Sequence, residues 1–265
     1  MTIATARTPG MGARPTPSFQ TAYGEVVPTV RAEQMRSLEQ RWMRERNGTP
    51  DHLAALAGGR LASVVTGWQT AGPLRVVVAA GAGWNGAAGL HAARALAQMG
   101  HAVAVVPVAQ GPFGARAVTA SPVLRGAVVR WVDPGRREAA FGEADVVVDA
   151  IVGCGLQGAA RGLAGGVIHD VNRLARRIVA ADLPSGMDAD TGLAWGPVVR
   201  PTVVVAFGLP KAGLAQAAAF GSDLLLADLR FAPSAVRALG LGYGNPFRRG
   251  PVVPVRVAIE AIGAD

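Results

Sequence analysis

The stretch that decides the fold is Arg75-Val-Val-Val-Ala-Ala-Gly-Ala-Gly-Trp-Asn-Gly86. Residues 75–80 form a short Val-rich run, which is typical of a strand buried on both faces. Residues 81–86 match G-x-G-x-x-G, and the helical pattern that follows, 86–99, is closed by Gly100. A glycine loop between a strand and a helix can bring free N–H groups close to a phosphate. Alone the match is weak, because an ordinary tight strand-to-helix turn can produce the same letters.

Runs of the same kind recur along the chain, and helical stretches separate most of them. The expected strands are 75–80, 102–108, 128–132, 146–150, 178–181, 202–207 and, less clearly marked, 224–227. Two further helices are expected before them, over 30–47 and from Pro50 onward with Thr49 as the cap. This alternation predicts an α/β protein with a Rossmann-like three-layer α/β/α fold and a mostly parallel sheet. Ligands of such folds bind at the carboxyl ends of the strands, where the strand order switches.

Residues 25–233 carry this pattern and are interpreted as one domain. Residues 1–24 are rich in Thr, Pro, Ala and Gly, contain no apolar segment of a secretory signal, and predict a flexible leader. Residues 234–265 are Pro-, Gly- and Arg-rich and predict an irregular tail. No apolar run approaches the length of a membrane span. The single cysteine, Cys154, excludes an internal disulfide, so we expect a reducing compartment and a cytoplasmic protein.

The net charge of +8 indicates acidic or phosphorylated partners. The basic residues form no long block and do not alternate with aromatic residues, which argues against nucleic acid. A phosphate-bearing small ligand explains the charge more simply. Of the 26 basic residues only Lys211 is a lysine. A lysine offers a compact point charge or a proton-transferring amine, which arginine does not, although chance retention is the alternative.

A dehydrogenase with this glycine loop would also need an acidic residue near the end of the second strand, to bind the ribose hydroxyls. Residues 102–110 read Ala-Val-Ala-Val-Val-Pro-Val-Ala-Gln and contain no acid. The sequence therefore argues against a hydride-transferring enzyme.

Three further motifs follow the strands. They are Asp145-Val-Val-Val-Asp149-Ala-Ile-Val-Gly153-Cys-Gly155-Leu156, Asp182-Leu-Pro-Ser185-Gly-Met-Asp188-Ala-Asp190-Thr-Gly192 and Phe207-Gly-Leu-Pro-Lys211-Ala-Gly213. With the weaker Ala32-Glu-Gln-Met35, this order of motifs resembles the YjeF N-terminal family, the fold of the NAD(P)H-hydrate epimerases. The resemblance runs from about 26 to 231. Read without it, Asp188 and Asp190 are ordinary turn-forming residues.

The resemblance implies an isomerase that interconverts the R and S hydrates of NADH and NADPH, and it implies a bound potassium ion. The potassium ligands carry over to Asn85, Asp149 and Ser185. Asp182 is the implied acid or base, and Lys211 supports charge or a phosphate. The contacts to the hydrated dinucleotide, some of them shared with these roles, carry over to Trp84, Asn85, Gly86, Ala87, Ala88, Gly153, Cys154, Gly155, Leu156, Gln157, Gly158, Ala159 and Asp182. We also expect a homodimer.

The chain departs from the family pattern in two places. The family loop reads Gly-x-Gly-Asn-Asn-Gly-Gly-Asp-Gly, whereas Trp84 replaces the first Asn here and Ala87-Ala88 replace Gly-Asp. The early helix has Ala54-Ala-Leu-Ala-Gly58 where the family often has Met-Glu-Asn-Ala-Gly. These changes predict an impaired epimerase, and they keep open a catalytically silent module for nucleotide binding or dimerisation.

Overall fold

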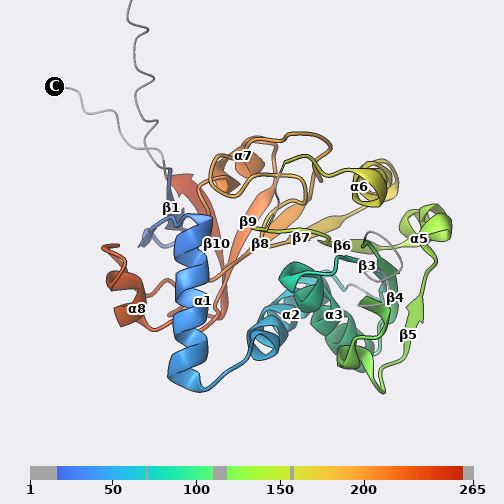
Figure 1. Ribbon diagram of the computed structural model, residues 1–265, viewed down its shortest axis with the longest axis horizontal. Coiled ribbons are helices and arrows are strands. Elements are labelled where there is room, and N and C mark those ends of the chain that lie inside the picture. Colours follow the sequence, from blue (N-terminus) through green and yellow to red (C-terminus); the bar gives the residue numbers. More distant parts are fainter. Residues whose placement is uncertain (1–16, 70, 110–117, 156–157, 259–265) are drawn as a thin grey trace, which may run out of the picture.

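A mixed sheet runs through the computed structural model, which describes residues 17–69, 71–109, 118–155 and 158–258 (Figure 1). The strands are β1 Ser18–Thr21, β2 Val26–Val27, β3 Arg75–Ala80, β4 Ala102–Pro107, β5 Val129–Trp131, β6 Val146–Ala150, β7 Ile178–Ala181, β8 Val203–Phe207, β9 Asp223–Ala227 and β10 Val252–Ala258. The helices are α1 Ala32–Arg46, α2 Pro50–Thr66, α3 Trp84–Gln98, α5 Arg137–Glu143, α6 Gly162–Leu174, α7 Leu214–Ala219 and α8 Pro233–Arg237. Short 3-10 turns occupy Pro122–Leu124 and Pro134–Arg136.

The strand order is β2-β1-β10-β9-β8-β7-β6-β3-β4-β5. All pairs from β9 to β5 are parallel, which confirms the Rossmann-like α/β prediction. The chain builds outward from β3 through β4 to β5, and then returns to the other side of β3 with β6. The strand order therefore switches between β3 and β6, and the loops after these two strands flank the switch.

Helices cover both faces of the sheet (Figure 1). On one face, α2 and α3 pack on inward residues of the central strands such as Val78, Val148 and Val205. On the other face, α5 and α6 cover the part around Val147, and α1, α7 and α8 cover the part around Val204. Strands that are buried on both sides explain why the sequence reads as continuous apolar runs. None of the helices in the described ranges combines the length and apolar composition needed to cross a bilayer.

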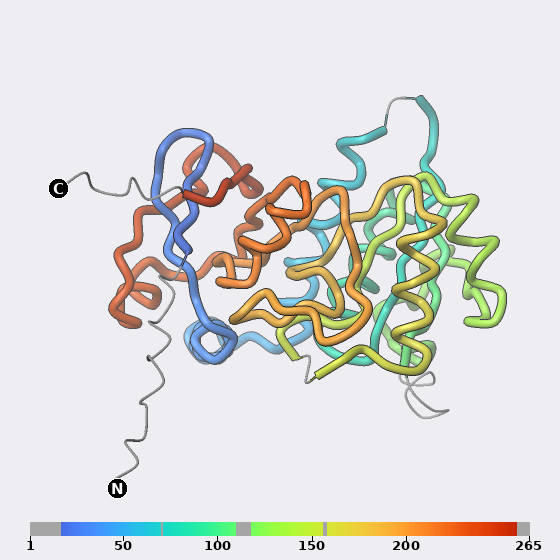
Figure 2. The backbone as a smooth tube through the Cα atoms, turned by 90° about the horizontal axis from the view of Figure 1, so that it is seen from above, coloured from blue at the N-terminus to red at the C-terminus, as the bar shows by residue number. Residues whose placement is uncertain are grey.

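The two ends of the described chain meet at one edge of the sheet (Figure 2). Strand β10 pairs antiparallel with β9 on one side and with β1 on the other. Residues 18–21 and 252–258 are thus ordered strands, where the sequence predicted a flexible leader and an irregular tail. Inward Val253 and Val255 alternate with exposed Pro254 and Arg256, so this strand has the period-2 pattern of a half-covered sheet. Residues 1–16 and 259–265 lie outside the described ranges.

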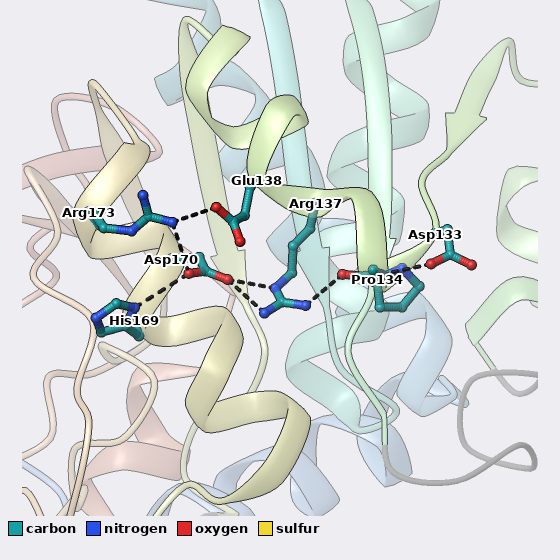
Figure 3. A network of polar contacts seen from close by, with 8 residues as sticks. Asp133, Pro134, Arg137, Glu138, His169, Asp170 and Arg173 are labelled. Carbon is teal, nitrogen blue, oxygen red and sulfur yellow. Dashed lines mark hydrogen bonds and ion pairs between the residues drawn. The ribbon is translucent and has the colours of Figure 1, made fainter.

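A polar network joins α5 to α6, the two helices that cover the sheet around Val147 (Figure 3). Asp170 is buried, and the Nε of Arg137 donates to its Oδ2 at 2.8 Å. Arg173 bridges Asp170 and Glu138, and His169 completes the cluster. Burial raises the pKa of Asp170, but the hydrogen bonds from His169 and the two arginines outweigh it and lower the pKa. The network fixes the crossover before β7.

Candidate active site

The glycine loop after β3 packs directly against the turn after β6. A Cβ at residue 81 would lie 1.9 Å from the carbonyl oxygen of Ile151, and a Cβ at residue 86 would lie 1.8 Å from the carbonyl oxygen of Gly81. Only glycine fits at either position, because no side-chain carbon tolerates these separations. Helix α3 begins with Gly83 as its N-cap, so no side chain caps its first N–H groups. The loop therefore presents an uncapped helix start at the switch point.

A pocket of about 350 Å³ lies at this point. Its lining residues are Arg36, Glu39, Gly83, Trp84, Asn85, Ile151, Val152, Gly153, Cys154, Gly155 and Asp182. Four separate segments thus meet around one space, and three of them follow β3, β6 and β7. A larger hollow of about 520 Å³ lies at the opposite ends of β3 and β4, and its lining contains none of the predicted site residues.

Asp182 follows β7 directly and is held in an unusual backbone conformation. Its φ is +67°, in the left-handed region that residues other than glycine rarely adopt. The carboxylate oxygen Oδ1 accepts from the N–H of Phe207 at 3.1 Å and from the ammonium of Lys211, while Oδ2 accepts from the thiol of Cys154 at 3.2 Å. Such strain persists only where the surroundings over-determine it, and it is common at functional sites.

The only lysine is the partner of this carboxylate. Lys211 is 1% exposed, and its Nζ also donates to the carbonyl oxygen of Phe207 at 3.1 Å. Burial lowers the pKa of Lys211, but the charge and hydrogen bond of Asp182, together with Cys154 and Glu39, outweigh burial and the pKa is raised. The ammonium is enclosed, so this geometry suits support of charge at Asp182 and does not suit contact with a phosphate. Burial, helped by Asp182, raises the pKa of the Cys154 thiol, which makes it a poor nucleophile.

Asp149 and Ser185 form a second buried group. Ser185 donates to the Asp149 carboxylate through its Oγ at 2.6 Å and through its N–H at 2.8 Å. The N–H of Val152 donates to the Ser185 Oγ at 2.9 Å, which attaches the turn after β6 to the loop after β7. Burial raises the pKa of Asp149 to about 6, although the bonds from Ser185 oppose the shift.

Asn85 lies on the other side of the same turn and is buried, yet neither its Oδ1 nor its Nδ2 has a hydrogen-bond partner in the described residues. A Cβ on Gly153 would lie 3.3 Å from the amide carbon of Asn85, so the side chain packs on this glycine. Buried polar atoms without a partner are rare and call for an explanation such as an ion. Asn85, Asp149 and Ser185 together offer hard oxygen donors around the 151–153 turn, and this donor set fits a cation such as potassium.

The predicted dinucleotide segments are split. One part lines the pocket and consists of Trp84, Asn85, Gly153, Cys154 and Gly155. The rings of Trp84 and Phe207 are packed edge-on, with their centroids 5.6 Å apart. Ala159 instead packs beside Gly196 of the 182–200 loop, and Gly158 is exposed. Leu156 and Gln157 lie outside the described residues.

Ala88 stands where the family pattern has an aspartate, and the resemblance implies it as a substrate contact. Ala88 is fully buried in the core between α2 and α3 and does not line the pocket. A Cβ on Gly58 would lie 2.6 Å from the carbonyl oxygen of Ala88, so α2 and α3 pack closely at this point.

Sequence reasoning missed two pocket residues, Arg36 and Glu39, which lie on one face of α1. Their three-residue spacing places them together, but only the packing of α1 shows that they face Asp182. Asp188 and Asp190 behave as the turn interpretation predicts. Asp188 accepts from the N–H groups of Asp190 and Thr191, and Asp190 accepts from the N–H of Ala32 at the start of α1.

Comparisons with known proteins show the family of this chain. The family model of the YjeF-related protein N-terminus matches residues 50–213. The chain belongs to this family. It is 34% identical over 240 residues to the NAD(P)H-hydrate epimerase of Dehalogenimonas lykanthroporepellens, which covers 89% of this chain and 96% of that one. An epimerase of the same name from Truepera radiovictrix is 34% identical, covering 71% of this chain and 84% of that one.

A crystal structure of the yeast protein YNL200c has a similar fold. It superposes with a TM-score of 0.73 at 22% sequence identity, covering 86% of this chain and all of that one. At this identity the likeness concerns the fold alone. The sequence-derived assignment to the YjeF N-terminal family is confirmed by the family match and by the two curated relatives.

Proposed function

We propose that this protein is an NAD(P)H-hydrate epimerase, which interconverts the R and S hydrates of NADH and NADPH. The observation that carries the proposal is the Asp182 carboxylate in the pocket at the strand switch, ion-paired to buried Lys211. Two relatives with this name cover most of the chain. The uncapped start of α3 in the same pocket suits the phosphates of a dinucleotide.

The chemistry requires proton transfer and stabilisation of positive charge. Protonation of the ring hydroxyl lets water leave, and addition of water to the other face of the resulting ring cation gives the other epimer. A carboxylate at the pocket wall stabilises such a cation and accepts the proton of the incoming water. Asp182 has this position, and the Lys211 ion pair and the Phe207 N–H hold its carboxylate in one orientation.

We further propose that Asn85, Asp149 and Ser185 hold a potassium ion. The support is the unpartnered buried amide of Asn85, beside the turn to which Ser185 and Asp149 are bonded. A bound potassium ion would supply a positive charge that orients oxygen atoms of the substrate. The described residues contain no cluster of three or more His, Cys, Asp and Glu side chains, so the donor set is one of amide, hydroxyl and carboxylate oxygens.

A single-epimer assay tests the activity. Purified protein is incubated with one chromatographically resolved hydrate of NADH, and the other epimer is measured by liquid chromatography against a sample without protein. We expect epimerisation, and we expect Asp182→Asn, once thermal unfolding shows that it is folded, to lower the rate by about 10²- to 10⁴-fold while binding persists. Asp223→Asn is the matched control, because Asp223 is exposed at the start of β9 and does not line the pocket.

A wild-type rate equal to the rate without protein overturns the epimerase proposal. If the dinucleotide hydrate still binds in that case, measured by saturation-transfer NMR, the silent binding module is the better description. The homodimer and the cytoplasmic location stay predictions, to be checked by sedimentation equilibrium and by cell fractionation.

A further inference from the structure

Helix α1 is anchored directly to the loops that carry Asp182 and Lys211. The N–H of Ala32 donates to the Asp190 carboxylate at 2.7 Å, and the N–H of Val30 donates to the carbonyl oxygen of Pro210 at 3.0 Å. Met35 and Leu38 are buried against the sheet and fix the rotation of the helix. The helix therefore presents a defined face to the pocket.

Glu39 lies on that face. It lines the same pocket as Asp182, Trp84 and Asn85. Glu39 is half-buried, and within the described residues its carboxyl group makes no hydrogen bond and no ion pair. A partly desolvated carboxyl without a partner, aimed at a pocket, is costly for the fold and calls for a function.

The surroundings of Glu39 differ from those of Asp182. Desolvation by burial raises the pKa of Glu39 to about 7, and the charge of Asp182 adds to the shift. Lys211 after β8 and Arg36 on α1 oppose it, and the Cys154 thiol after β6 is a further titratable group nearby. Helix α3 contributes no charged residue to the pocket. Near neutral pH, Glu39 therefore carries a proton for much of the time, whereas Asp182 is bonded to an ammonium.

We propose that Glu39 is the proton donor of the site and that it works with Asp182 on opposite faces of the nicotinamide ring. The proposal rests on the epimerase function proposed above. It assigns the acid and the base of one reaction to two carboxyl groups in different surroundings, Glu39 without a partner and Asp182 bonded to an ammonium.

The step balances without any redox partner. The O–H bond of Glu39 breaks, and its proton goes to the ring hydroxyl. The C–O bond then breaks with its electron pair on oxygen, water leaves, and the ring nitrogen lone pair stabilises the cation. Water adds to the opposite face, and its surplus proton goes to Asp182. Return of that proton to Glu39 through water in the open pocket restores the starting state.

The test compares three variants in the single-epimer assay. Glu39→Gln keeps the size of the side chain but cannot donate a proton as a carboxylic acid, and Glu39→Asp keeps the acid. Glu33→Gln is the matched control, because Glu33 is an exposed carboxylate on the same helix and does not line the pocket. We expect Glu39→Gln to lower kcat by about 10²- to 10⁴-fold with KM little changed. Thermal unfolding confirms that each variant is folded.

The pH profile separates proton donation from a structural role. Since the donor must be protonated, wild-type kcat/KM should fall as pH rises through about 7. Glu39→Asp should keep such a decline and Glu39→Gln should lose it. If Glu39→Gln is as active as Glu33→Gln and keeps the alkaline decline, Asp182 or solvent supplies the proton and the proposal is overturned while the epimerase function stands.

A second measurement does not depend on turnover. Carboxyl ¹³C spectra of glutamate-labelled protein, with the Glu39 signal assigned by its loss in Glu39→Gln, report the ionisation of Glu39 directly. A midpoint near 7 supports the proposal, and a midpoint at the ordinary glutamate value overturns it whatever the activity.

Discussion

Lys211 and Asp182 form a buried ion pair, although they follow two different strands, β8 and β7. Lys211 is 1% exposed, and the bond of its ammonium to Asp182 is supplemented by one to the Phe207 carbonyl. The pair joins the loops after β7 and β8 beside the pocket, and it explains why this position needs a lysine. An arginine guanidinium is larger and planar, and it would not fit a space shaped around a single ammonium.

Removing the cation alone should destabilise the protein strongly. Lys211→Met leaves the Asp182 carboxylate buried without its charged partner, so we expect a loss of about 3–5 kcal/mol in the free energy of unfolding, measured by urea titration. The double variant Lys211→Met/Asp182→Asn should recover much of the loss, because it removes both charges. Arg41→Met breaks an exposed pair with Glu45 and should cost about 0.5 kcal/mol or less. Equal losses for Lys211→Met and Arg41→Met would contradict a tightly coupled buried pair.

The unpartnered amide of Asn85 leads to a cation-dependent prediction. In a buffer whose only cation is tetramethylammonium, Asn85→Leu should raise the free energy of unfolding by about 1–3 kcal/mol, because it removes two unsatisfied buried atoms. Adding potassium should raise the melting temperature of the wild type and leave that of Asn85→Leu unchanged. Asn172→Leu is the control and should lower the free energy of unfolding, since Asn172 donates to the Val198 carbonyl and accepts from the Arg200 N–H. A potassium effect that survives in Asn85→Leu would remove Asn85 from the site.

Restoring the family aspartate at residue 88 should harm the protein. Ala88 is fully buried in an apolar core, so Ala88→Asp places a carboxylate there with no partner. We expect a loss of about 2 kcal/mol or more and no gain in epimerisation. Ala139→Asp, on the exposed side of α5, should cost less than about 1 kcal/mol. A marked gain in activity for Ala88→Asp would mean that the pocket extends between α2 and α3.

The raised pKa of Glu39 makes a prediction about stability as well as rate. Folding raises this pKa from 4.5 to about 7, so the protonated form is favoured in the folded state. The associated stability is fully present below pH 4.5 and is lost as pH rises through 7. The free energy of unfolding of Glu39→Gln should therefore equal that of the wild type near pH 4 and exceed it at pH 8. The difference at pH 8 should stay below about 3 kcal/mol, because the group is partly solvated. Thermal unfolding at the two pH values measures the difference. A pH-independent difference would show that Glu39 ionises as freely in the folded protein as in the unfolded one.

The parallel strands could be predicted to within one residue at each end, because strands buried on both faces leave uninterrupted apolar runs. Strand β10 escaped prediction because Pro254 and Arg256 interrupt its run, although both point outward at a half-covered edge. The site was predictable where residues follow a strand directly, as Asp182 does. Glu39 was not, because its surroundings depend on how α1 packs, and its local sequence resembles that of exposed Glu33. Ala88 shows a related limit, since the glycine-loop motif does not indicate whether residue 88 faces the pocket or the core.

The pairing of β1 with β10 has a consequence for the order of folding. The two strands are separated by more than two hundred residues of chain. Contacts this distant in sequence are slow to form, since a large loop must close first. The parallel strands around β3 lie closer in sequence to the strands with which they pair, so these pairs can form sooner. We therefore expect the edge that carries β1 and β10 to close last, and until then one side of β9 is unpaired and exposed to other chains.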